Sequence, residues 1–172
     1  MGYAWWAIAV PALALMPITA TQAAVRTVAV FNFELDDTSL DGAMNGPRAD
    51  EAARIAQIST QLRGWLAGRS DVRVASIAPV AKDAAAVHLQ ACGGCDADLA
   101  KRVGAELSIT GTVQKVSNLI LNMSIHIRDV ASGRVVATMN ADMRGNTEES
   151  WMHTMRWLER NRLADALSEV TQ

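Results

Sequence analysis

Apolar and polar residues alternate over three stretches in the last third of the chain, at residues 107–114, 121–128 and 135–143. A period of two gives a strand one apolar and one polar face. Turn-forming residues separate the stretches, with Ser117-Asn118 in the first gap and Ala131-Ser132-Gly133 in the second. The pattern therefore predicts an antiparallel meander of three half-buried strands.

The preceding residues alternate between strand and helix patterns. Residues 26–34 are mainly β-branched and apolar and predict a first strand, and residues 72–75 predict a short second one. Between them, apolar residues recur at helical spacing from Asp50 to Gly68, which predicts a long helix. Residues 35–49 are rich in Asp, Ser, Gly and Asn and predict a long loop.

Three further helices complete the expected order. Weaker helical patterns cover residues 84–89 and 96–103, and a last helix, carrying Trp151 and Met155, follows Asn146 and Glu149, which could cap it reciprocally. The order β-α-β-α-α-β-β-β-α predicts a single α+β domain over residues 24–172. We expect a mixed sheet of about five strands, ending in the antiparallel meander and covered by three or four helices.

The N-terminal segment predicts export. Residues 1–24 contain no charged side chain, and most of Trp5 to Ile18 is apolar. Small residues near Ala23 suit a signal peptidase, so residues 1–23 are expected to be a signal peptide cleaved near Ala23. Two prolines in a short apolar stretch disfavour a membrane span, so we expect a periplasmic mature protein without one.

Composition and charge exclude several function classes. Half of the residues are hydrophobic, 20% are charged, and the formal net charge is −2. No basic run offers a footprint for nucleic acid, so no nucleic-acid partner is expected. The chain also lacks a phosphate loop and a dinucleotide fingerprint, and no cofactor is expected.

The two cysteines, Cys92 and Cys95, are separated by two glycines and lie just before the helix expected at 96–103. In an exported protein the favoured interpretation is a structural disulfide. A redox-active pair is the alternative, because a helix N-terminus lowers a thiol pKa. A third possibility is a metal site of His88, Cys92 and Cys95, although structural zinc needs a fourth ligand. Asp96 stands where a haem-attachment motif needs His.

The acidic loop and one tryptophan are candidate contact sites. Asp36, Asp37 and Asp41 make the loop a possible protein contact. The run from Asp37 resembles the front of a calcium loop, but Arg48 stands where a bidentate Glu is needed. Trp157 lies off the apolar stripe of the last helix and is a candidate interface anchor. The three histidines accompany no nucleophile motif, so no catalytic residue is predicted.

Several motifs resemble known bacterial envelope proteins. Residues 28–33 (Val-Ala-Val-Phe-Asn-Phe) and 104–113 (Gly-Ala-Glu-Leu-Ser-Ile-Thr-Gly-Thr-Val) resemble the N-terminal domain of the translocation protein TolB and the related curli-secretion protein CsgG. Residues 113–121 and 144–151 resemble an uncharacterised family of periplasmic proteins. The resemblance implies a TolB N-terminal-like fold, a role in envelope assembly or interaction, and a periplasmic or envelope protein as partner. A quinoprotein dehydrogenase system is one candidate source of that partner.

Together these observations predict a non-enzymatic periplasmic protein that binds another envelope protein or serves it as an accessory module. The alternatives are a thiol–disulfide carrier using Cys92 and Cys95, and a metal-binding accessory protein.

Overall fold

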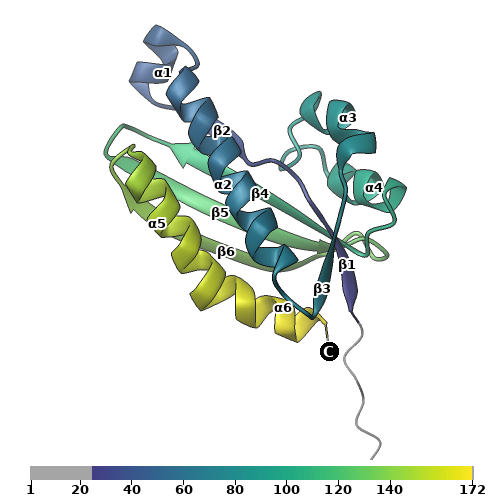
Figure 1. The fold of residues 1–172 in the computed structure, drawn as a ribbon. Helices are drawn as coiled ribbons and strands as arrows, with labels where there is room; N and C mark the ends of the chain where they lie inside the picture. The colour runs from purple at the N-terminus through teal and green to yellow at the C-terminus, as the bar shows by residue number, and fades with distance from the viewer. Residues whose placement is uncertain (1–24, 172) are drawn as a thin grey trace, which may run out of the picture.

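The computed structural model describes residues 25–171. The expected signal peptide at 1–23, with its cleavage near Ala23, lies outside the described residues. Within them, a six-stranded mixed sheet forms the centre of the fold (Figure 1). Its strands are β1 (Arg26–Val30), β2 (Glu34–Asp37), β3 (Val72–Ala75), β4 (Leu107–Lys115), β5 (Ile120–Asp129) and β6 (Val135–Arg144).

The strand order is β3-β1-β4-β5-β6, and β2 also pairs with β4. β1 runs parallel to the first residues of β4, and β2 runs parallel to its last residues, so the two short strands share one side of β4. β5 and β6 follow antiparallel to β4 and to each other. The predicted meander is therefore confirmed, and it makes up half of the strands.

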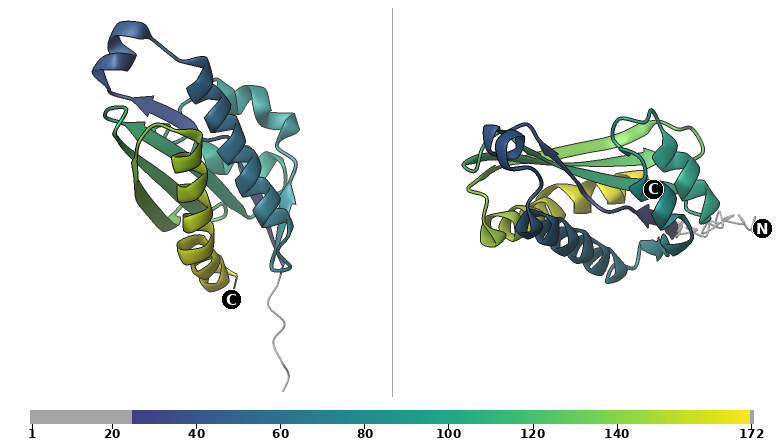
Figure 2. Two further views of the ribbon diagram at one scale, coloured as in Figure 1. Left: turned by 60° about the vertical axis from the view of Figure 1, so that its left-hand side comes forward. Right: turned by 90° about the horizontal axis from the view of Figure 1, so that it is seen from above.

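The helices cover the sheet unequally. α2 and the rod formed by α5, η2 and α6 lie side by side on one face, whereas α3 and α4 lie on the other face beside β1 (Figures 1 and 2). η2 is one turn of π-helix. The helices are α1 (Leu40–Asn45), α2 (Ala49–Ala67), η1 (Ala78–Val80), α3 (Ala81–Ala85), α4 (Cys95–Arg102), α5 (Glu148–Leu158), η2 (Glu159–Leu163) and α6 (Ala164–Val170).

Two apolar cores result, one on each face. The larger core lies under α2 and α5, where Leu62 and Trp151 pack over Ile109 and Ile125 of the sheet. The smaller core includes Phe31, Leu89, Leu99 and Ala100. Beyond the smaller core, β5 and β6 present polar side chains on that face. The predicted α+β class is confirmed.

Gly111 shows how closely the larger core approaches β4. It occupies an inward position of the alternating pattern, and a Cβ there would overlap the ring of Phe33. The absence of a side chain lets the aromatic ring lie directly on the strand.

The structure corrects several predicted elements. Residues 35–49 are not one loop, because they contain most of β2 and all of α1. The first strand ends at Val30 rather than residue 34, and the helix expected at 84–89 lies earlier, at Ala81–Ala85. Thr147, not Asn146, caps α5: its hydroxyl accepts from the Ser150 amide at 3.2 Å. The sheet has six strands rather than about five, and there are more helices than the expected three or four.

Candidate functional site

The parallel strands β2 and β4 end at the same edge of the sheet, and a buried lysine organises that edge. Lys115 is the last residue of β4 and has no exposed surface. Its alternating position turns its side chain toward the face covered by α2. The amide of Thr38 donates to the Lys115 carbonyl at 3.0 Å, which holds the start of the α1 connection against β4.

Three carboxylates surround the Lys115 ammonium. Its Nζ lies 2.7 Å from Glu51 Oε1, 3.0 Å from Asp37 Oδ2 and 3.3 Å from Asp41 Oδ2. These groups come from β2, α1 and the first turn of α2. We call Lys115, Glu51, Asp37 and Asp41 the Lys115 cluster.

Asn146 connects the Lys115 cluster to α5 and to the β4–β5 hairpin. Its side-chain amide donates to Glu51 Oε1 at 2.6 Å, and its Oδ1 accepts from Trp151 Nε1 at 3.1 Å and from an Arg54 guanidinium nitrogen at 2.8 Å. Its main-chain amide donates to the Asn118 carbonyl at 2.9 Å. The hydrogen bonds of Asn146 thus join the start of α2, the start of α5 and the β4–β5 hairpin to the Lys115 cluster.

The charges in the cluster stabilise one another. Burial alone lowers the pKa of Lys115, but hydrogen bonds to Glu51 and Asp37 outweigh burial and raise it. For Asp37, burial raises the pKa, whereas hydrogen bonds from Ser39 and Lys115 lower it more, so the net shift is downward. Hydrogen bonds from Asn45 and Lys115 also lower the pKa of Asp41. Lys115, Asp37 and Asp41 are therefore charged near neutral pH.

This geometry bears on the predicted acidic loop. The carboxylates of Asp37 and Asp41 do converge, as a cation site would require, but the cation between them is the Lys115 ammonium. Asp36 is exposed and forms none of the ion pairs of the described residues. The contact role predicted for the three aspartates stays a prediction. Among them, Asp36 is the one whose carboxylate is not paired with Lys115.

Sequence reasoning missed Lys115, although the pattern held a signal for it. The inward positions of β4 continue from Leu107 through Val113 to Lys115. A lysine on an apolar strand face requires carboxylate partners, because an unpaired buried ammonium is strongly destabilising. Acidic residues concentrate in the segment from Asp36 to Glu51, which supplies those partners.

Exposed apolar side chains gather at the same edge, on α1 and on the β4–β5 hairpin. Leu40 and Met44, one turn apart on α1, are 75% and 74% exposed, and Leu119 at the hairpin turn is 73% exposed. The two elements touch, because the Asn118 amide donates to Asp41 Oδ2 at 3.5 Å. We define the tip patch by five large apolar residues: Leu40, Met44, Val116, Leu119 and Ile120.

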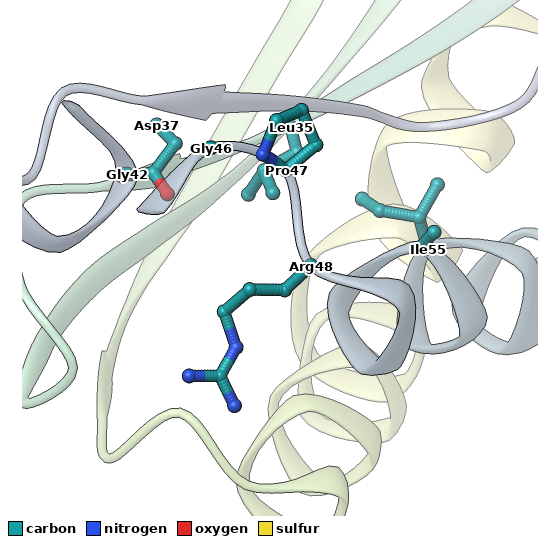
Figure 3. A pocket seen from close by; sticks show the side chains of 8 residues that line it. Leu35, Asp37, Gly42, Gly46, Pro47, Arg48 and Ile55 are labelled. Atoms are coloured by element: carbon teal, nitrogen blue, oxygen red, sulfur yellow. The ribbon is translucent and has the colours of Figure 1, made fainter. Parts of the chain in front are cut away.

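A cavity of about 500 Å³ opens between β2, the residues after α1 and the start of α2 (Figure 3). Leu35, Pro47 and Ile55 supply apolar walls. Arg48 also lines it, and its guanidinium is paired with Asp50 at 3.0 Å. From β2 the cavity receives both the apolar Leu35 and the carboxylate of Asp37, which is paired with Lys115.

Cys92 and Cys95 form a disulfide, with their Cα atoms 5.7 Å apart. Cys92 is exposed and Cys95 is half-buried at the start of α4. The preceding residues are held separately, since Glu34 accepts the amides of Leu89 at 2.9 Å and Gln90 at 3.4 Å. We call residues 88–95 the disulfide loop.

The structure places the three residues of the predicted metal site, His88, Cys92 and Cys95. His88 is exposed, and both sulfur atoms of its proposed co-ligands belong to the disulfide. Over residues 25–171, no group of three or more His, Cys, Asp or Glu side chains is arranged to hold a metal ion.

A polar cluster on the face that carries α4 also escaped prediction. Asp96 is 1% exposed, and its Oδ2 accepts from Ser108 Oγ at 2.5 Å and from Arg128 Nε at 3.0 Å. His126 lies two residues before Arg128 on the same face of β5, and its Nδ1 is buried without a hydrogen-bond partner in the described structure. Burial first, and then the Arg128 charge, lower the pKa of His126.

Trp157 is half-buried rather than fully exposed. It packs against the edge of the larger core, and the Arg162 guanidinium lies 5.6 Å from its ring centroid. Its predicted interface role stays a prediction. Trp151 is fully buried, as its place on the apolar stripe indicates.

Comparison with known proteins connects the fold to bacterial relatives. The family model DUF3280, described as a protein of unknown function (DUF2380), matches residues 26–163. No curated protein is similar enough in sequence to be matched to this chain. Within residues 25–171, every helix is too short or too polar to cross a membrane.

Several solved structures of bacterial proteins have a similar fold. The LpoB C-terminal domain from Escherichia coli is 16% identical with a TM-score of 0.50, over 72% of this chain and 86% of that one. Lipoprotein GNA1162 from Neisseria meningitidis is 13% identical with a TM-score of 0.49, over 81% and 97% of the chains. TolB from Acinetobacter baumannii is 11% identical with a TM-score of 0.42, over 80% of this chain and 28% of TolB. At these identities, the LpoB comparison supports the fold alone.

Proposed function

This chain belongs to the DUF3280 family, and we propose that it is a non-enzymatic, exported protein-binding module whose tip patch docks an apolar surface of another envelope protein. The observation that carries the proposal is the exposure of five large apolar side chains on two touching elements. Groups of this kind on a protein surface typically mark interaction sites.

The tip patch has a rigid base. α1 has no buried residue of its own, so its own packing cannot hold it in place. It is held instead by Asp41, which accepts from Lys115 and Asn118. Because the base is preorganised, docking requires little ordering of the chain, which favours affinity.

The charges near the tip patch favour a protein over a bilayer. The nearby residues Asp36 and Asp41 are acidic, and Arg48 is already paired with Asp50. Binding to anionic lipid needs a cluster of basic residues, which the chain does not offer here. An apolar protein surface with a polar rim fits the patch better.

Export is supported by two features of the chain. The first 24 residues are uncharged and largely apolar, and the disulfide is typical of an oxidising compartment. A quinoprotein dehydrogenase system stays a predicted source of the partner.

Site-specific photo-crosslinking in the native envelope tests the proposal. A photoreactive residue placed at Leu119 in the full chain should yield a discrete protein adduct, identified by mass spectrometry. The same probe at Lys101, which is exposed on α4, is the matched control and should yield none. The double variant Leu40→Ser with Met44→Ser should abolish the adduct.

Stability measurements keep the result interpretable. Because Leu40 and Met44 are exposed, the double variant should unfold within about 1 kcal/mol of the parent. Equal adducts from Leu119 and Lys101, or binding of the purified protein to phosphatidylglycerol vesicles through the tip patch, would contradict the proposal.

The disulfide loop supports a second candidate function, a thiol–disulfide carrier. The disulfide lies at the N-terminus of α4, and Cys92 is its exposed member. Such a position stabilises a thiolate. A reduction potential between roughly −230 and −120 mV would favour this function, and one below about −300 mV would mark a structural disulfide.

A further inference from the structure

We propose that the free edge of β2 is a second binding site, which takes an extended peptide of alternating apolar and basic residues as an added strand. This site is separate from the tip patch and does not depend on the function proposed for it.

The first argument comes from the main chain. Among the described strands, β2 pairs only with β4, through the register Glu34↔Thr112 to Asp37↔Lys115. The Thr38 amide points to β4, where it donates to the Lys115 carbonyl. In a parallel pair alternate residues direct their amides and carbonyls to the same neighbour, so those of Leu35 and Asp37 point outward. An added strand satisfies such groups.

The second argument is the open space beside that edge. Leu35 lines three cavities, of about 500, 340 and 330 Å³. The first lies toward α1 and α2, the second toward α3, and the third toward the disulfide loop. Ile55 lines the first two and His88 lines the last two, so the cavities adjoin along β2. β2 thus forms the floor of one groove.

The third argument concerns which side chains the groove accepts. Directly opposite residues of paired strands share a face of the sheet. A residue opposite Leu35 would face the apolar walls at Pro47 and Ile55 (Figure 3). A residue opposite Asp36 would lie on the other face, near the third cavity, which Glu34 and Asp36 also line.

Charge selects a basic residue at that second position. Asp36 is exposed and forms none of the ion pairs of the described residues. Glu34 is held by the Leu89 and Gln90 amides rather than by a cation. The one arginine beside the groove, Arg48, is paired with Asp50. A Lys or Arg side chain complements this edge, whereas an acidic one is repelled.

Titration of the full mature protein with a synthetic peptide tests the proposal. The probe is a blocked heptapeptide of alternating lysine and valine, followed by calorimetry and amide chemical shifts. We expect saturable binding at one site, with the largest shifts at β2. The same peptide with all of its main-chain amides N-methylated should bind at least about tenfold more weakly, because it cannot donate to the edge.

Variants of the protein locate the site. Ala52 is exposed on α2 and lines the first cavity, so Ala52→Phe should fill the cavity and weaken binding about tenfold. Ala53→Phe is the matched control, since Ala53 is also exposed but lines a different pocket. Asp36→Asn should weaken binding several-fold, and more at low salt than at high salt.

Specific outcomes would overturn the proposal. These are equal binding of a glutamate–valine peptide, no effect of N-methylation, equal effects of Ala52→Phe and Ala53→Phe, or no binding. The variant Leu40→Ser with Met44→Ser should bind the peptide like the parent. If it lost the peptide, the tip patch and not β2 would be the site.

Discussion

The Lys115 cluster and the disulfide loop both attach a connecting segment to the sheet, but they do so in different ways. The Lys115 cluster uses one buried ammonium shared by three carboxylates. The disulfide loop uses a covalent link together with separate hydrogen bonds, from Leu89 and Gln90 to Glu34 and from Gln90 Nε2 to Thr110 Oγ1 at 2.8 Å.

The difference lies in how each region responds to the loss of one member. Without Lys115, the carboxylates of Asp37 and Glu51 would lose their nearest cation, and Glu51 is itself fully buried. Without the disulfide, the hydrogen bonds of Leu89 and Gln90 that precede it remain. We therefore expect the Lys115 cluster to fail as a unit and the disulfide loop to lose stability only in part.

Replacement of Lys115 should have the largest effect. Lys115→Met should lower the free energy of unfolding by about 3–5 kcal/mol at pH 7, because it removes one partner of a buried ion pair. Urea unfolding followed by circular dichroism measures it. Lys101→Met, at an exposed position of α4, is the control and should stay within about 0.5 kcal/mol of the parent. Similar losses in both variants would contradict the cluster's role.

Asp37→Asn should have a smaller effect that depends on pH. It weakens a charge-assisted hydrogen bond, so we expect a loss of about 2 kcal/mol at pH 7. The pKa of Asp37 is lowered in the folded state, so its contribution is present above about pH 4 and is lost as pH falls through the lowered value. Parent and variant should therefore converge in acid, and a constant difference between them from pH 7 into acid would contradict the role of the Asp37 charge.

Removal of the disulfide should cost less. The double variant Cys92→Ser with Cys95→Ser removes the covalent ring. Because a ring this short restricts the unfolded chain little, the free energy of unfolding should fall by less than about 2 kcal/mol. The amides of Leu89 and Gln90 should keep their hydrogen-exchange protection. Loss of that protection would show that the disulfide, and not Glu34, holds the loop.

The same contrast explains what the sequence could predict. The meander was predictable because β4, β5 and β6 each bury every second residue, as at Ile109, Ile125 and Met139. α2 was predictable from a long helical period. The Cys92–Cys95 pair was visible because two cysteines in a short run have few structural roles.

β2 and α1 were not predictable from local pattern. β2 contains three acidic residues in four, and such residues are depleted in strands. It forms because β4 supplies its hydrogen bonds and Lys115 neutralises Asp37, and these contacts span 78 residues of sequence. Long-range partners of this kind leave no periodic signal in the segment itself.

Replacement of His126 should have the smallest effect on stability. That effect should appear at a higher pH than the effect of Asp37 in the Lys115 cluster. His126 lies close to the disulfide loop, because it pairs across the sheet with Thr110, which accepts from Gln90. Because burial and Arg128 lower its pKa in the folded state, folding is disfavoured as pH falls below about 6.5, the unfolded value.

His126→Gln should therefore remove a loss of stability of less than about 1 kcal/mol that develops as pH falls below about 6.5, which is above the pH at which the Asp37 contribution is lost. Urea unfolding at a series of pH values measures it. An identical slope in parent and His126→Gln would mean that the His126 ring reaches water and that the polar face of β5 is more open than the buried Nδ1 indicates.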